Sequence, residues 1–289
     1  MAFLPRRRLP DTVRVATLDL QHSHRRSAVV LGPVQLPPLA ELRARFAAMA
    51  AVGPVTRIGL RPSTSSARWR FCPDAAGSAV TEASPVVDTD PAALLTALRQ
   101  LPGAGIRVLA CGEYLAIDFS HGLGEIPLLD MLVAVLLGGA DPCDAALWKP
   151  YRHAVAPLPV AAVRAIGLGP QRLLPLWRQH RRNKAAPSAP AAVGDLGVGP
   201  SPATRIGRIS ADEVSELRRQ RDSAQPGVSL FAIHTCALHE AFARQGFDVD
   251  PAVTVPFDVR RYLPAGWDTL ASFSAGLEFT LDPVAGSRA

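Results

Sequence analysis

Cysteine is scarce in this chain of 289 residues, and the four cysteines stand far apart. No two of them form a C-x-x-C pair, which excludes a zinc-finger signature and a dense disulfide framework. Cysteines spaced in this way indicate reduced, mostly buried thiols and predict a cytoplasmic protein. They are Cys72, Cys111, Cys143 and Cys236.

Aromatic residues are also few, at 6% of the chain, and charged residues make up 19%. The net charge is +6, but the basic residues lie in separate short runs: PRRR, HSHRR and RQHRRNK. Because nucleic-acid-binding surfaces usually interleave basic and aromatic residues on one face, the composition predicts no nucleic-acid partner. The positive charge is either a solvated surface or an attraction for an anionic substrate.

Long apolar runs are missing as well. The longest, IPLLDMLVAVLLGGA, is interrupted by Asp130 and is too short to span a bilayer, so it predicts a core helix. The opening MAFLPRRRLPDTVRV lacks the apolar stretch of a signal peptide, and we expect none. The chain contains no GxGxxG, P-loop or G-x-S-x-G motif, which argues against nucleotide-binding enzymes of those kinds and against a serine nucleophile.

Short strand-like and helix-like segments alternate along the chain and predict an α+β fold. The two apolar runs of 105–121 are separated by Cys-Gly-Glu and predict a β-hairpin. Asp90 before Pro91 predicts a capped helix start. In the second half, TRIGRIS at 204–210 reads as a strand, and Ser210 with Glu213 predicts a capping box for the helix that follows.

His121 is the best candidate for catalytic chemistry. It follows the apolar run YLAIDFS and precedes a turn that contains Gly122 and Gly124. An imidazole at a strand end titrates near neutral pH and can take a proton from a hydroxyl or an amine. The glycines allow a ligand or backbone to approach closely. From the residues alone this is a weak signal, because a lone histidine in a turn is more often structural than catalytic. Asp118 either orients the histidine, is solvated, or caps the turn.

The other histidines give no metal-ligand pattern. His234 and His239 are five residues apart on a predicted helix, whereas ligand pairs on a helix prefer a spacing of three or four. We therefore expect no metal site. The remaining histidines are His22, His24, His153 and His180.

Residues 120–126, SHGLGEI, resemble a degenerate form of the His-His-x-x-x-Asp-Gly motif of the condensation-domain superfamily. That superfamily includes chloramphenicol-acetyltransferase-like enzymes, polyketide-associated acyltransferases and wax ester synthase/diacylglycerol acyltransferases. In this match Ser120 takes the place of the first histidine and His121 that of the second, which family members use catalytically. Glu125 takes the place of the aspartate, whose salt bridge to an arginine is mainly structural. The resemblance makes Arg260 the candidate partner of Glu125, with Arg261 second; the alternative is that Glu125 and Arg260 are unrelated surface charges.

Other segments follow the family's order. PPLAELRARFAAM and ARWRF precede the motif, and VSLFAIHTCALHEAF resembles the helix that opens the second lobe. VTVPFDVRRYLP resembles the family's Val-Pro-x-Asp-x-Arg strand, and LASFSAGL its Gly-Asn-Phe segment, with Ser272 where asparagine is usual. The resemblance implies a chloramphenicol-acetyltransferase-like two-lobe sandwich. We expect an N-terminal lobe at 1–183, a linker or crossover at 184–204, and an incomplete, truncated C-terminal lobe at 205–289.

The resemblance implies an acyltransferase that moves an acyl group from CoA or a carrier-protein thioester to a small alcohol or amine. His121 is its expected general base, and Ser120, Gly122, Gly124 and Glu125 support the motif. The thioester is a substrate, and no cofactor is expected. Because the second lobe is short, we expect a homodimer or a partner chain to complete it. The degraded motif leaves an alternative: a catalytically inactive relative that binds a ligand or partner without turnover.

Overall fold

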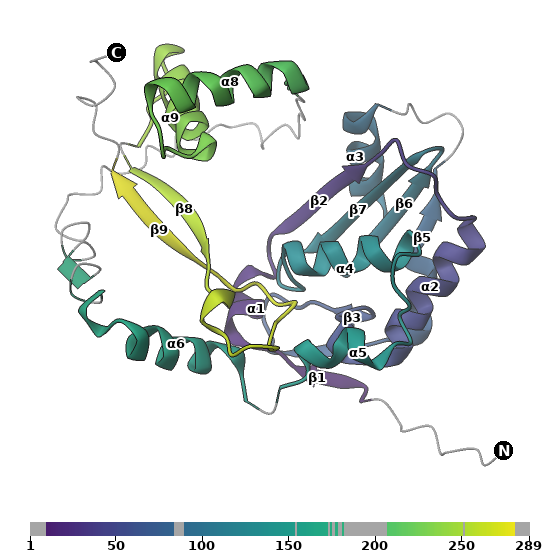
Figure 1. Ribbon diagram of the computed structural model, residues 1–289. Coiled ribbons are helices and arrows are strands. Elements are labelled where there is room, and N and C mark those ends of the chain that lie inside the picture. Colours follow the sequence, from purple (N-terminus) through teal and green to yellow (C-terminus); the bar gives the residue numbers. More distant parts are fainter. Residues whose placement is uncertain are drawn as a thin grey trace. The chain divides into compact units, whose positions relative to one another are not determined.

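The computed structural model describes residues 10–83, 90–153, 155–172, 174, 177–178, 181, 207–250 and 252–280. The chain divides into two compact units, which comprise residues 1–200 with 258–274 and residues 201–257 with 275–289. Helices and strands occur in both units, so the predicted α+β class is confirmed (Figure 1). The predicted linker at 184–204 lies outside the described residues. Residues 258–274, which the sequence analysis placed in the C-terminal lobe, belong to the first unit.

A four-stranded sheet forms the centre of the first unit. Its strand order is β2 (Arg26–Leu31), β7 (Tyr114–Ser120), β6 (Arg107–Cys111) and β5 (Val80–Glu82). β6 and β7 form the predicted hairpin, with Cys111 opposite Tyr114, and β5 runs parallel to β6. β7 is hydrogen-bonded on both sides, which holds its C-terminal end, where His121 follows, firmly in place.

Helices cover both faces of this sheet (Figure 1). The alternation of β7 sends Leu115, Ile117 and Phe119 to one face, where α2 (Leu39–Val52) and α4 (Ile126–Leu136) pack against them. Ala116 faces the other way, against α3 (Pro91–Gln100). Each fully buried aliphatic side chain in such a core stabilises the fold by about 1.5–3 kcal/mol.

A second, three-stranded sheet has the order β1 (Thr12–Arg14), β4 (Arg68–Phe71) and β3 (Leu60–Arg61). The short helix α1 (Thr17–His22) follows β1 and leads into β2. Three single-turn helices accompany these elements: η1 (Pro54–Thr56), η2 (Pro73–Ala75) and η3 (Gly77–Ala79).

After α4 the first unit continues through α5 (Ala145–Trp148), η4 (Lys149–Tyr151), α6 (Pro157–Leu168) and η5 (Pro170–Arg172). The later segment 258–274 returns to this unit and carries η6 (Arg260–Tyr262). A small apolar cluster joins the two parts, because Ala161 of α6 packs with Leu263 and Phe273.

The second unit contains α8 (Ala211–Ala224), α9 (Leu230–Arg244) and most of the paired strands β8 (Ala252–Asp258) and β9 (Ser274–Thr280). The capping box predicted for Ser210 and Glu213 is confirmed. The strand predicted at 204–210 is wrong for its described residues, 207–210, which are neither strand nor helix. The hydroxyl of Ser210 caps the N-terminus of α8, so these residues lead into a helix and do not form a strand.

Candidate functional site

The end of β7 and the turn after it carry the candidate site. Ser120 is buried, and its hydroxyl donates to the carbonyl of Ser23 at 3.0 Å, which ties the strand end to the segment after α1. The backbone N–H of His121 donates to the carbonyl of Arg25 at 2.8 Å. Two further turn amides are used locally, since Leu123 bonds Ser120 and Gly124 bonds His121. The backbone of the turn is therefore fixed.

Gly122 and Gly124 let the neighbouring backbone approach this turn. A Cβ on Gly122 would lie 2.3 Å from the carbonyl oxygen of Asp19, and one on Gly124 would lie 2.2 Å from that of Leu270. Both separations are well below van der Waals contact, so only glycine fits at either position. The close approach foreseen from the sequence is thus an approach of backbone, from α1 on one side and from segment 258–274 on the other.

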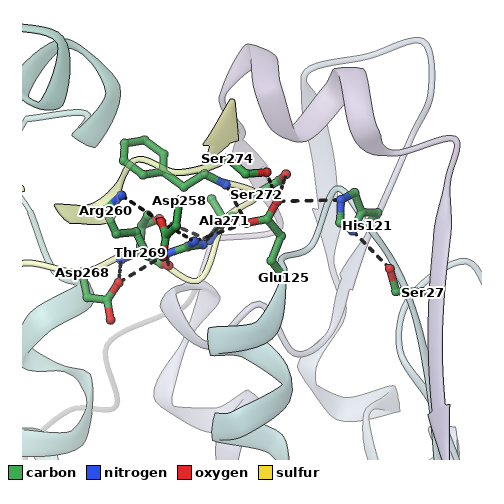
Figure 2. A network of polar contacts seen from close by, with 11 residues as sticks. Ser27, His121, Glu125, Asp258, Arg260, Asp268, Thr269, Ala271, Ser272 and Ser274 are labelled. Atoms are coloured by element: carbon green, nitrogen blue, oxygen red, sulfur yellow. Dashed lines mark hydrogen bonds and ion pairs between the residues drawn. The ribbon is translucent and has the colours of Figure 1, made fainter. Parts of the chain in front are cut away.

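The imidazole of His121 lies between three side chains of the first unit, two of which, Ser27 and Glu125, are shown in Figure 2. Its Nδ1 is 3.1 Å from the hydroxyl of Ser27 on β2, and its Nε2 is 3.8 Å from Oε1 of Glu125. The ring of His22 meets it edge to face, with centroids 5.3 Å apart. The His121 side chain is 27% exposed, so it is held by neighbours and still reachable from solvent.

The carboxylate of Glu125 accepts four hydrogen bonds from segment 258–274 (Figure 2). Oε1 accepts from the hydroxyls of Ser272 and Ser274 at 2.8 and 2.6 Å. Oε2 accepts from the backbone N–H of Phe273 at 3.1 Å and from Nη1 of Arg260 at 3.2 Å. A carboxylate offers about four lone-pair sites, so Glu125 is satisfied without His121.

Arg260 is the arginine that pairs with Glu125, as the resemblance implied. Its guanidinium also donates to the carbonyls of Thr269 and Ala271 and lies 3.2 Å from a carboxylate oxygen of Asp258. Arg260 therefore holds parts of segment 258–274 together, and Glu125 binds the segment in that arrangement. Arg261, the second choice, lies instead over the ring of Tyr262, 6.0 Å from its centroid.

Burial lowers the pKa of His121 below its ordinary value of 6.5. The carboxylate of Glu125 opposes that shift, while the nearby His22 and Arg25 add to it. For Glu125, burial would raise the pKa, but the bonds from Ser274, Phe273 and Ser272 and the charge of Arg260 outweigh burial, so the pKa lies below 4.5. At neutral pH the site thus pairs a neutral imidazole with an ionised carboxylate.

Asp118 does not orient His121, and the prediction of a solvated or turn-capping aspartate is wrong. Its carboxylate is 1% exposed, accepts from Nε of Arg26 at 3.0 Å, and also pairs with Arg107. Asp118 follows the alternation of β7 to the face opposite Ile117 and Phe119, and it lies directly across from Arg107 on β6. Two arginines from the flanking strands neutralise it there, which makes it structural.

Sequence reasoning missed Ser27, His22 and Ser274 as members of the site. Ser27 belongs to β2, and only the pairing of β2 with β7, which sets Ser27 opposite Phe119, brings it to His121. His22 has its Nδ1 buried without a hydrogen-bond partner among the described residues. Ser274 gave a usable signal, because it stands two residues after Ser272, the spacing that puts two side chains on one face of an extended segment.

The described part of the chain contains no cluster of three or more histidine, cysteine or acidic side chains arranged to hold a metal ion. In the same residues, no helix has the length and apolar character needed to cross a membrane. Comparisons with protein-family models, with curated proteins and with solved structures found no match to this chain.

Proposed function

We propose that the chain is an acyltransferase that uses His121 as a general base to move an acyl group from a CoA or carrier-protein thioester to an alcohol or amine. The arrangement of His121 supports this most directly. Its Nδ1 lies against the hydroxyl of Ser27, its pKa is lowered, and its Nε2 faces a carboxylate whose acceptor sites other donors already fill. A neutral imidazole with one nitrogen engaged and the other available suits proton abstraction.

In the proposed reaction, Nε2 of His121 takes the proton of the acceptor as its oxygen or nitrogen attacks the thioester carbonyl. The tetrahedral intermediate then collapses, the carbon–sulfur bond breaks, and the proton passes from His121 to the departing thiolate. No acyl-enzyme is needed. Leu123 and Gly124 use their backbone N–H groups within the turn, which leaves the N–H of Gly122 as the candidate donor to the oxyanion.

We also propose a fold for the chain and a positioning role for Glu125. The chloramphenicol-acetyltransferase-like sandwich implied by the motif is the architecture in which such a histidine would meet its two substrates. Within the first unit, the bonds of Glu125 to Arg260, Ser272 and Ser274 link the histidine turn to segment 258–274. Glu125 is thus a positioning residue in the proposal, and it takes no proton from substrate.

One observation favours the alternative, a relative that binds without turnover. Oε1 of Glu125 lies 3.8 Å from Nε2 of His121, which is the nitrogen that would act on the acceptor. A carboxylate at that position restrains the imidazole and occupies part of the space beside it. In this alternative His121 and Glu125 are a structural pair, and the chain recognises a ligand or a partner.

The release of free thiol from acyl-CoA in the presence of alcohol and amine acceptors separates the two functions. We expect release by the native chain, and a loss of at least about a hundredfold in His121→Ala, since general-base catalysis contributes roughly 10²–10⁴-fold. His24→Ala is the matched control, because His24 is an exposed histidine from the same part of the first unit. Thiol release that His121→Ala leaves intact, or none across a broad acceptor panel, contradicts the acyltransferase proposal.

A further inference from the structure

The three-stranded sheet of the first unit has one core face and one solvent face. Along β4, Trp69 and Phe71 are buried, whereas Arg68 and Arg70 alternate to the outside and are exposed. The flanking strands add Arg14 from β1 and Arg61 from β3, both exposed. The outer face of this small sheet is therefore dominated by arginine.

The strand register sets these arginines in a zigzag across the three strands, with Arg68 and Arg70 on the central strand β4. Arg14 lies directly opposite Arg68, and Arg61 lies directly opposite Arg70. Directly opposed residues have Cβ atoms about 5 Å apart, and residues two apart on one strand are separated by about 7 Å. Thr12 is opposite Arg70 on its other side and adds an exposed hydroxyl to the face.

Some exposed arginines elsewhere in the described residues have carboxylate partners, whereas others, such as Arg208 and Arg218, have none. Arg219 pairs with Glu216, and Arg244 pairs with Glu240. None of the four sheet arginines forms an ion pair with any residue that the structure describes. Like charges placed directly opposite each other on adjacent strands are destabilising. An external anion would relieve that repulsion.

We propose that this arginine face, formed by Arg14, Arg61, Arg68 and Arg70, docks on the surface of a bilayer that contains anionic phospholipids. The four arginines are part of a sheet face, and they can meet several phosphates in one plane without entering a groove. The guanidinium group matches phosphate with two parallel N–H···O bonds.

A nucleic-acid partner fits the face less well. The aromatic residues of β4, Trp69 and Phe71, are buried in the core and offer no surface on which a base could stack. The docking proposal does not depend on the acyltransferase proposal, since no arginine of this face belongs to the His121 site.

Sedimentation with vesicles tests the docking. The native chain should bind vesicles of phosphatidylcholine mixed with phosphatidylglycerol, and it should not bind vesicles of phosphatidylcholine alone. Each arginine near an anionic surface strengthens binding by roughly fivefold, so replacing all four by glutamine should weaken it several-hundred-fold. Added salt should weaken the binding of the native chain, because the attraction is electrostatic.

The matched control replaces four exposed arginines of the second unit: Arg208→Gln, Arg218→Gln, Arg219→Gln and Arg244→Gln. It removes the same charge, from +6 to +2 in both variants because each loses four arginines. If position on the sheet matters, the control keeps most of its vesicle binding. An equal loss in both variants would overturn the proposal, since net charge alone would then explain the binding.

Folding is checked by circular dichroism and thermal unfolding. The arginine-face variant should unfold at the same or a higher temperature than the native chain, because it removes two like-charge pairs. If the quadruple variant does not fold, the double variant Arg14→Gln with Arg61→Gln is tested in its place. Its vesicle binding should be roughly 25-fold weaker than that of the native chain. No binding to phosphatidylglycerol vesicles, or tighter binding of a DNA duplex through the same arginines, overturns the bilayer assignment.

Discussion

Nη1 of Arg260 donates to Oε2 of Glu125 at 3.2 Å and so joins two residues that are 135 positions apart in the sequence. Both side chains are largely buried, at 12% and 11% exposed. The pair links the start of α4, directly after the His121 turn, to segment 258–274 of the same unit. Whatever His121 does, its surroundings depend on this link.

Removing either partner of this ion pair should destabilise the first unit. Arg260→Gln should lower the free energy of unfolding by about 3 kcal/mol, because it leaves the largely buried carboxylate of Glu125 without its counter-charge. Glu125→Gln should cost less, because Arg260 keeps Asp258 and Asp268 as partners. In the double variant the losses should not add, and the coupling should be about 1–3 kcal/mol. Urea unfolding of the native chain, the two single variants and the double variant measures this coupling free energy.

Arg261→Gln serves as the control for that cycle. Arg261 is the neighbouring arginine, is exposed, and lies over Tyr262. Its replacement should cost at most about 1 kcal/mol, as is usual for exposed charged side chains. Strict additivity of the Glu125 and Arg260 losses would show that the two charges do not stabilise each other.

The contribution of Glu125 to stability should depend on pH with a defined sign. Its pKa in the folded protein lies below the ordinary 4.5, so between the two values the unfolded state binds more protons than the folded state. The stabilisation is therefore complete above pH 4.5 and is lost as the pH falls through the folded-state pKa. The difference in unfolding free energy between the native chain and Glu125→Gln should shrink in that window, and a constant difference would contradict the shift.

The glycines of the turn give a separate prediction. Gly122→Ala and Gly124→Ala should each lower the free energy of unfolding by about 1–3 kcal/mol, because a Cβ would overlap a backbone carbonyl oxygen. Gly207→Ala is the control, since a Cβ there meets nothing within 4 Å and the expected change is within about 0.5 kcal/mol. Thermal or urea unfolding compares them. Equally small effects at all three positions would show that the turn can shift and so avoid overlap between the added Cβ and the neighbouring carbonyl oxygens.

Local patterns in the sequence predicted the elements that position the site. The apolar runs on either side of Cys-Gly-Glu gave the β6–β7 hairpin, and Asp90 indeed caps α3 through the N–H groups of Ala92 and Ala93. Hairpins and caps depend on residues close together in the chain, which is why they are readable. The Glu125–Arg260 pair is a long-range contact, and only the motif resemblance suggested it.

The contacts that were missed depend on strand order. Asp118 is buried between Arg26 and Arg107 because β2 and β6 flank β7, and Ser27 reaches His121 for the same reason. Nothing in the sequence near Asp118 specifies those neighbours. The register of β1, β4 and β3, which opposes four arginines in pairs, is equally invisible until the strands are paired.

The protonation of His121 can be measured separately from that of the other histidines, and this measurement tests the site directly. Its imidazole pKa, followed by NMR, should lie below 6.5, chiefly because of burial. His22→Phe keeps an aromatic ring against His121 but removes a repelling charge, so the pKa should rise. Glu125→Gln removes an attracting charge, so the pKa should fall further. His24→Phe is the control and should leave it unchanged. Shifts of the same sign in His22→Phe and Glu125→Gln would mean that a change in burial, and not these two charges, sets the pKa of His121.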